Sequence, residues 1–202
     1  MTKTPLRISG ILNSIYAGFW IRLGSILLDT LILLPVTGII LYVNNLRIEN
    51  YMFTIIPSLI FGLWYNVYLV KKYGGTPGKL IVGIKIIASN GNKIEWKHAI
   101  LRYIVLFLIT LISVFIMIRS IGIADNAYYD SLPWIQKTQY LMNLSPILLS
   151  IYNWSDNIWI YGELIVLLTN KRKRSVHDFI AGTVVIKKKY EELIKNNLIY
   201  SN

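Results

Sequence analysis

Residues 23–43 read LGSILLDTLILLPVTGIILYV, and Asp29 is the one charged residue among them. A helix of about 20 apolar residues is as long as the hydrocarbon core of a bilayer is thick. Three further apolar runs follow at residues 51–70, 99–118 and 147–169. Hydrophobic residues make up 54% of the chain and charged residues 15%, whereas soluble domains carry roughly a quarter charged residues. The sequence therefore predicts an all-α fold, a polytopic transmembrane helical bundle of about four spans in a single membrane domain.

The fourth run is less uniform than the others, because Asn153, Ser155, Asp156 and Asn157 fall near its middle. One interpretation is a single span with a polar waist. The other is that Asp156 is the N-cap of a shorter helix, since Asp favours N-caps and this composition is typical of turns. We favour the second interpretation, in which a helix over residues 157–169 follows an interfacial segment.

The stretch between the second and third spans is predicted to lie on the membrane surface. Residues 80–87 form an apolar segment that is too short to cross a bilayer. The segment is rich in Ile and Val, and Asn90-Gly91 behind it is a strong tight-turn signal, so we expect a short strand or interfacial element here. Farther on, residues 134–142 are expected to form a surface helix and residues 187–202 a basic cytoplasmic tail.

Positive charge is concentrated in three segments of the chain. The net charge is +11, and Lys and Arg cluster in residues 1–22, in residues 71–102 and after the fourth span. With four spans these segments share one side, which the positive-inside rule identifies as the cytoplasm. We therefore expect both termini on the cytoplasmic side of a bacterial cytoplasmic membrane, beside anionic lipid headgroups. This setting explains the basic composition without nucleic acid. The other loops carry only Arg47, Arg119 and Lys137.

The sequence offers little for catalysis. It contains no cysteine, which excludes disulfides, thiolate metal sites and Cys nucleophiles. His177 and Asp178 could orient an imidazole, but no nucleophile motif or metal-binding spacing accompanies them. The simpler interpretation is that Asp178 anchors a turn and pairs with a nearby Arg or Lys. We therefore expect no enzymatic activity, no cofactor and no metal site.

The glycine-rich segment Gly75-Thr76-Pro77-Gly78-Lys79 differs from a phosphate-binding loop, which has four residues between its glycines and a Ser or Thr after the Lys. Gly and Pro favour turns, so we expect a tight turn at the membrane surface. Exposed amides in such a turn, together with the Lys ammonium, could also touch a lipid phosphate.

Two pairs of polar residues lie seven positions apart in predicted spans, which places each pair on one stripe of its helix. The first is Arg22 with Asp29. A carboxylate inside a bilayer is costly unless it is paired, protonated or facing a cavity. Asp29 is therefore either a proton- or cation-binding group or half of a buried ion pair that fixes helix packing. The second pair is Asp156 with Glu163, and Glu163 is the stronger candidate for an intramembrane acid because it has no capping role.

Several separated blocks of the chain resemble the RDD family of integral membrane proteins. They are residues 17–22, 75–79, 82–86, 177–178 and 181–186, together with Asp29, Arg102 and Arg174. The family is named after one Arg and two Asp, which correspond here to Arg22, Asp29 and Asp178. The resemblance implies a membrane protein; some members are linked to sodium/proton exchange, and others look like accessory partners of membrane proteases or quality-control complexes.

Two functional hypotheses follow. The first is a non-enzymatic accessory or regulatory protein that binds another membrane protein. The second is a monovalent cation/proton antiporter in which Asp29 binds the ion and Arg22 is its electrostatic partner. Four spans are few for alternating access and no internal repeat is visible, so an antiporter would have to be a homo-oligomer. A water-accessible cavity shared by Asp29 and Glu163 would favour the antiporter.

Overall fold

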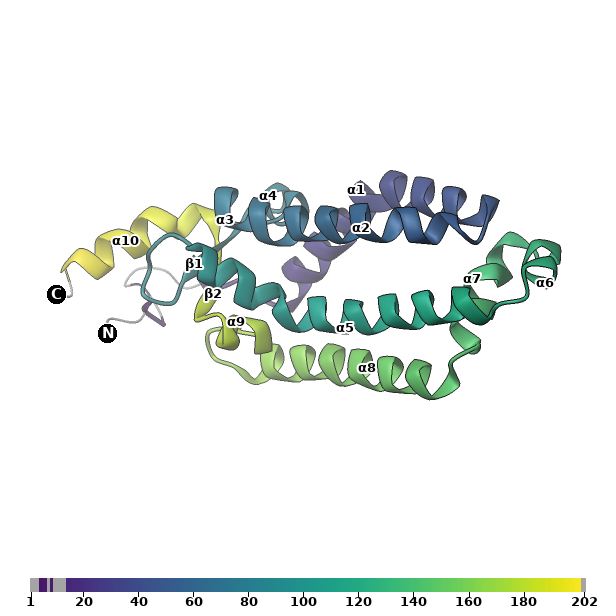
Figure 1. The fold of residues 1–202 in the computed structure, drawn as a ribbon. Helices are drawn as coiled ribbons and strands as arrows, with labels where there is room; N and C mark the ends of the chain where they lie inside the picture. The colour runs from purple at the N-terminus through teal and green to yellow at the C-terminus, as the bar shows by residue number, and fades with distance from the viewer. Residues whose placement is uncertain (1–3, 7, 9–13, 201–202) are drawn as a thin grey trace. The chain divides into compact units, whose positions relative to one another are not determined.

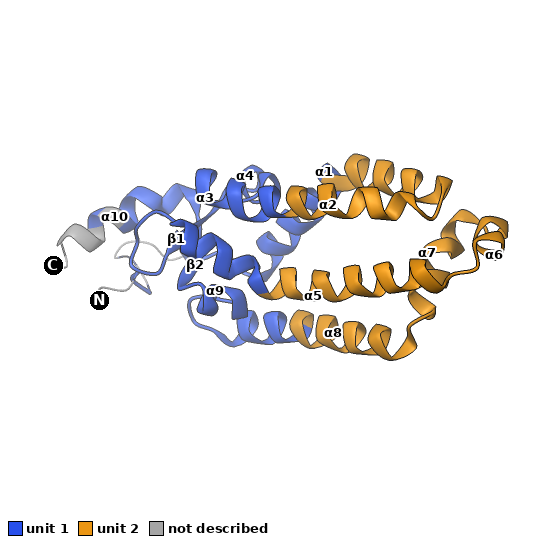
Figure 2. Cartoon of the chain, in the orientation of Figure 1, with its two compact units in different colours: residues 1–32, 63–104, 161–202 blue, residues 33–62, 105–160 orange. Residues whose placement is uncertain are grey.

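A computed structural model describes residues 4–6, 8 and 14–200 (Figure 1). The chain divides into two compact units (Figure 2). Unit 1 comprises residues 1–32, 63–104 and 161–202, and unit 2 comprises residues 33–62 and 105–160.

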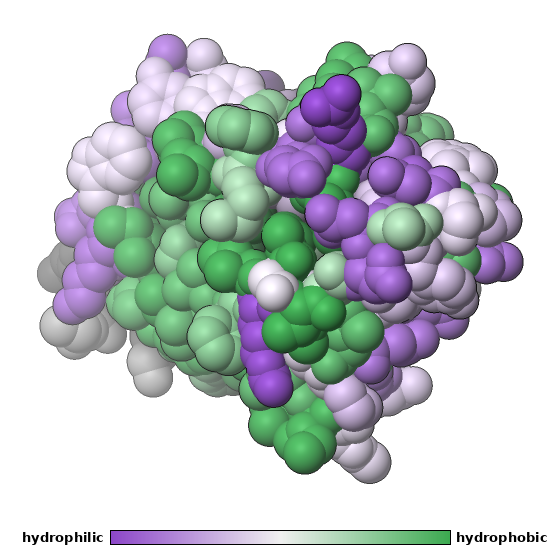
Figure 3. All heavy atoms as spheres, turned by 45° about the vertical axis from the view of Figure 1, so that its right-hand side comes forward, coloured by the Kyte–Doolittle hydropathy of each residue, from purple (hydrophilic) through white to green (hydrophobic). Residues whose placement is uncertain are grey.

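Three helical runs are long and apolar enough to cross a membrane, which confirms the predicted polytopic all-α fold. They are α1 (Phe19–Leu46), the run Asn50–Ile81 and α5 (Trp96–Ile123). The second run contains α2 (Asn50–Leu63), the π-helix η1 (Trp64–Tyr68), α3 (Leu69–Tyr73) and α4 (Pro77–Ile81). In the most apolar window of α1 only 6% of residues are buried inside the protein. Hydrophobic residues also cover a wide area of the visible face in Figure 3. Such exposure of apolar side chains suits lipid and not water.

The helix α8 (Pro146–Thr169) is continuous over 24 residues, long enough to cross a bilayer. The interpretation of Asp156 as an N-cap is therefore wrong, because Asp156 lies in the middle of this helix. Local turn and cap preferences of single residues are weak compared with helix propagation over the apolar turns on either side. Its polar centre makes α8 less apolar than the three runs above.

Unit 2 also contains α6 (Asn126–Ser131) and α7 (Trp134–Asn143), which follow α5 in Figure 1. The helix α7 confirms that residues 134–142 are helical, as predicted. Together they cover the C-terminal end of α1, where a helix leaves carbonyls without intrahelical donors. Lys137 donates to the Asn45 carbonyl at 3.0 Å, and Tyr129 donates to the Asn44 carbonyl at 3.0 Å. A buried apolar cluster packs beside them: Ile48, Tyr51, Tyr129 and Leu141.

Unit 1 contains a two-stranded antiparallel sheet of β1 (Ile84–Ala88) and β2 (Thr183–Lys187). Ile84 pairs with Lys187 and Ala88 with Thr183. The strand predicted within residues 80–87 is confirmed in its second half. The first half instead belongs to α4, and the chain turns between them at Gly83, whose φ is +72°. The pairing partner β2 was not predicted.

The helix α9 (Val176–Ile180) leads into β2, and the 3-10 turn η2 (Lys188–Tyr190) with α10 (Glu191–Tyr200) follows it. The turn η2 and the helix α10 lie in the predicted tail at residues 187–202, and the last two residues of this tail lie outside the described residues. The free edge of β2 is covered by the chain before α1, because the Ala17 amide donates to Val185 and the Lys187 amide to Ile15, each at 2.9 Å. Covering a sheet edge in this way satisfies backbone groups that would otherwise be unpaired.

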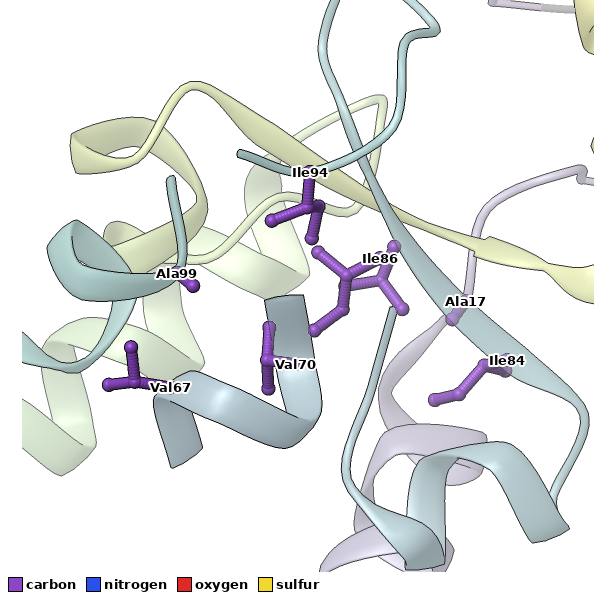
Figure 4. Close-up of a cluster of buried hydrophobic side chains, with 8 residues drawn as sticks. Ala17, Val67, Val70, Ile84, Ile86, Ile94 and Ala99 are labelled. Atoms are coloured by element: carbon purple, nitrogen blue, oxygen red, sulfur yellow. The ribbon is translucent and has the colours of Figure 1, made fainter. Parts of the chain in front are cut away.

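Both faces of the sheet are buried, as side-chain alternation along a strand allows. One face packs against α1, α3 and α5, as Figure 4 shows for a cluster whose buried members are Ala17, Val67, Val70, Ile84, Ile86, Ile94, Ala99 and Val185. The other face packs against the N-terminal segment and α10 through Ile8, Ile15, Tyr16, Ile87, Val184, Ile186 and Ile194. The sheet is therefore the core of unit 1, and it joins segments from both ends of the chain.

Candidate functional site

Asp178 is a fully buried carboxylate in the first turn of α9. Its side chain accepts a hydrogen bond from the Ser175 amide at 3.1 Å, which completes a capping box. The same carboxylate accepts from Arg22 Nη1 at 2.8 Å and forms a short ion pair with Arg102 Nη1. Thr183 at the start of β2 adds a hydroxyl donor at 3.3 Å. One carboxylate thus connects α1, α5, α9 and β2.

The electrostatics of this cluster favour the ionised acid. Burial by itself raises the pKa of the Asp178 carboxyl. The guanidinium groups of Arg102 and Arg22 outweigh that effect and hold the pKa of Asp178 well below its usual range. A buried charge is tolerated when it is paired and hydrogen-bonded, and both conditions hold here.

Each of the three guanidinium nitrogens of Arg22 donates a hydrogen bond near this cluster. Besides Asp178, the guanidinium donates from Nε to the Ala17 carbonyl at 3.1 Å and from Nη2 to the Lys173 carbonyl at 2.5 Å. The hypothesis that Arg22 is the partner of Asp29 is therefore wrong. The two residues share a stripe of α1, but the Arg22 guanidinium binds Asp178, which lies 156 positions farther along the chain.

Asp29 has a separate set of partners and is 9% exposed. Its Oδ1 accepts from the Tyr65 hydroxyl at 2.6 Å and from the Gly78 amide at 2.7 Å. Its Oδ2 accepts from the Thr76 hydroxyl at 2.5 Å, and Lys79 Nζ lies 3.7 Å away. Tyr65 comes from the π-helical turn η1, a type of irregularity that is frequent at functional sites.

The glycine-rich segment reaches Asp29 because Gly78 has no side chain. A Cβ on Gly78 would lie 2.4 Å from the Ser25 carbonyl oxygen and 2.7 Å from the Asp29 amide nitrogen, both backbone atoms of α1. Pro77 begins α4, where its missing N–H is not needed. The expected turn is thus a bend at Gly74-Gly75 followed by a helix start, and the Gly78 amide is buried against Asp29 instead of being exposed to lipid phosphate.

Glu163 of α8 contacts α9 and not Asp29. Its Oε2 lies 2.6 Å from His177 Nδ1, and its Oε1 accepts from the His177 amide at 2.8 Å. Burial lowers the pKa of the His177 imidazole and Arg102 lowers it further, against the opposing carboxylates of Asp178 and Glu163. A neutral imidazole that donates to the Glu163 carboxylate fits this arrangement. Asp156 lies in unit 2 and is half-exposed.

The expectation that Asp178 anchors a turn and pairs with an Arg or Lys is confirmed by the capping box and the two ion pairs. Sequence reasoning also named Arg22 and Arg102, but did not identify them as the partners of Asp178. It did not name Tyr65, Ser175 or Thr183 as contributors. The Ser175-to-Asp178 spacing is a capping-box signal that could have been found. Within the described residues, no group of three or more His, Asp or Glu side chains could hold a metal ion.

The fold and this buried network define a polytopic helical membrane protein in which a small sheet and two buried carboxylate clusters join the ends of the helices. The chain belongs to the RDD family, whose sequence profile matches residues 16–182. The RDD residues thus divide between two clusters, because Arg22 and Asp178 form an ion pair while Asp29 binds the glycine-rich segment.

Two relatives come from Bacillus subtilis strain 168. The uncharacterized membrane protein YteJ is 24% identical over 188 residues, which cover 89% of this chain and 85% of YteJ. The uncharacterized protein YckC is 25% identical over 174 residues, which cover 84% of this chain and 83% of YckC. No solved structure matches the chain.

Proposed function

We propose that this protein is a non-enzymatic accessory or regulatory subunit that binds another integral membrane protein. The observation that carries the proposal is an exposed polar stripe on α8. Asn153 and Asn157 are one helical turn apart and both are exposed, in a helix whose neighbouring residues are largely apolar.

We propose that α8 crosses the membrane, as its 24 residues allow. An exposed amide on such a helix calls for a hydrogen-bonding partner, because lipid tails offer none. Asn157 donates to the Asn153 carbonyl of its own helix at 2.7 Å. Within the part of the chain that the structure describes, no hydrogen bond involves the Asn153 side chain. Asn side chains hydrogen-bond across helices in membranes, typically contributing about 1–2 kcal/mol in peptides. A transmembrane helix with polar side chains would complement this stripe.

The buried acids also support an accessory role over transport. Asp29 is held by Tyr65, Thr76, Gly78 and Lys79, and an exchange cycle would have to replace these contacts with a cation at every turnover. Glu163 is bound to α9. Asp29 and Glu163 therefore have contacts that hold helices together.

We further propose that unit 1 is on the cytoplasmic side of a bacterial cytoplasmic membrane, with both termini there. The support is that the described parts of all three basic segments belong to unit 1. Lys and Arg collect on the cytoplasmic side of membrane proteins.

The experiment is site-specific photo-crosslinking in intact cells. A photoreactive amino acid would replace Asn153, and the matched control position is Ile39, an exposed residue of α1 in the same unit. We expect a discrete adduct with another membrane protein at position 153 and not at position 39. The partner, identified by mass spectrometry, should co-purify with the parent chain and not with the N153L/N157L variant.

Two outcomes would overturn the proposal. Adducts that contain only lipid or a second copy of this chain would remove the hetero-partner. Sodium-dependent proton flux in proteoliposomes, lost in D29N and retained in D130N, would instead establish the cation/proton antiporter. Asp130 is an exposed acid, so D130N controls for the loss of one negative charge.

A further inference from the structure

Unit 1 contains a groove of about 800 Å³ that none of the carboxylate clusters occupies. Its lining includes two apolar residues, Ile21 in the first turn of α1 and Val82, which follows α4. It also includes the junction between β2 and α10, where residues 187–189 are three consecutive lysines. The groove therefore combines apolar and cationic lining residues.

The groove carries an excess of positive charge. Glu191 and Glu192 also line it. Lys85 of β1 forms an ion pair with Glu191, with both carboxylate oxygens 2.9 Å from its Nζ. That contact compensates Glu191, so the lining carries three lysines against the exposed Glu192, and the ammonium of Lys189 lies 4.9 Å from the Tyr190 ring.

The position of Ile21 relates the groove to the bilayer. Ile21 belongs to the start of a helix that is long and apolar enough to cross the membrane. The end of such a helix lies where hydrocarbon meets headgroups. Lys188 and Lys189 are exposed and can approach the phosphate layer, while Ile21 and Val82 offer apolar surface to an acyl chain.

We propose that this groove binds an anionic phospholipid, with its phosphate diester on the ammonium groups of residues 187–189 and its glycerol and first acyl carbons against Ile21 and Val82. The apolar and the cationic lining residues match the two chemical halves of such a molecule. A soluble phosphate ester shares the anionic half alone. The inference does not depend on the proposed accessory function, because the groove and the polar stripe of α8 share no residue.

The experiment measures lipid binding to the full-length protein by native mass spectrometry from detergent micelles. The probes are phosphatidylglycerol, phosphatidylcholine and, as a soluble phosphate ester, glycerol 3-phosphate. The test variant is K188Q/K189Q. The matched control is K93Q/K97Q, which removes two exposed lysines of the same unit outside the groove. Melting curves of both variants would verify that they fold.

We expect the parent to bind phosphatidylglycerol more tightly than phosphatidylcholine. Each lysine at an anionic surface contributes roughly a fivefold gain in affinity, so K188Q/K189Q should bind phosphatidylglycerol roughly thirtyfold more weakly. K93Q/K97Q should stay within about twofold of the parent, since screening limits distant charges.

Three results would overturn the inference. Equal binding of both lipids by the parent would remove headgroup selectivity. Equal losses in the two double variants would show general surface attraction and not a site in the groove. Glycerol 3-phosphate that binds as tightly as phosphatidylglycerol, with the same dependence on Lys188 and Lys189, would assign the groove to a soluble phosphate ester.

Discussion

Replacing Asp178 by Asn should destabilise the protein by about 3–5 kcal/mol. The variant keeps the volume of the side chain but removes its charge. Arg22 at 2.8 Å and Arg102 then remain buried without an ionic partner, at 8% exposure for Arg22 and 7% for the Arg102 side chain. A hydrogen bond to a charged group contributes about 1.5–3 kcal/mol, and two are weakened here, so their full loss would cost about 3–6 kcal/mol, a range that contains this value.

The assay is equilibrium unfolding in mixed micelles at pH 7.5, where Asp178 is ionised in both the folded and the unfolded chain. D130N is the control, because Asp130 is exposed and its substitution should change the free energy of unfolding by less than about 0.5 kcal/mol. The double variant D178N/R102M should lose at most about 1 kcal/mol of unfolding free energy beyond the loss in D178N, because Arg102 has already lost its ionic partner in D178N.

Two results would refute this reasoning. A D178N variant within about 0.5 kcal/mol of the parent would mean that the two arginines do not depend on the carboxylate. Strict additivity of D178N and R102M would mean that the two residues are not coupled, contrary to their direct contact.

Three further predictions use other contacts. In the same assay, Gly78→Ala should lower the free energy of unfolding by about 3 kcal/mol, because its Cβ would clash with α1. Gly24→Ala, whose Cβ would meet nothing within 4 Å, should be neutral or stabilising, and equal effects of the two substitutions would contradict the close approach at Gly78. Lys137→Met should lower the free energy of unfolding by about 1–2 kcal/mol, because it removes the donor to the Asn45 carbonyl and the ammonium 4.8 Å from the Tyr129 ring. Lys93→Met, at an exposed position, should lower it by less than about 0.5 kcal/mol, and equal losses would contradict the capping role of Lys137. Burial depresses the pKa of His177, so the unfolded chain gains a proton first as the pH falls. The stability present above about pH 6.5 should therefore be lost toward the folded pKa, with a slope below the one-proton limit of about 1.4 kcal/mol per pH unit because 26% of the side chain is exposed. A slope that is unchanged in His177→Gln would contradict this assignment.

The helices could be predicted from the sequence because hydrophobic length alone identifies a membrane span. The observed bounds of α1 and α5 extend the predicted spans by several residues at each end. The polar centre of α8 misled local reasoning, because a cap preference at Asp156 has to compete with helix formation on both sides. Membership in a long helix is a property of the whole segment.

The buried clusters could be predicted only in their composition. Spacing along α1 suggested an Arg22–Asp29 pair, but spacing carries no information about a carboxylate near the other end of the chain. The partner strand β2 was missed for the same reason, since five residues of Thr, Val, Ile and Lys are ambiguous until β1 lies beside them. The close approach at Gly78 is likewise visible only when α1 and α4 are seen together.

The convergence of distant segments on Asp178 has a consequence for biogenesis. Arg22 and Arg102 leave the ribosome and reach the membrane before the codon for Asp178 is translated, and β1 is made almost a hundred residues before β2. Until residues 178–187 are made, the nascent protein holds two arginines without their acid and a strand without its partner. Insertion can proceed helix by helix, but the core of unit 1 needs β2, so a chain that terminates before Asp178 lacks both the acid of the two arginines and half of the sheet.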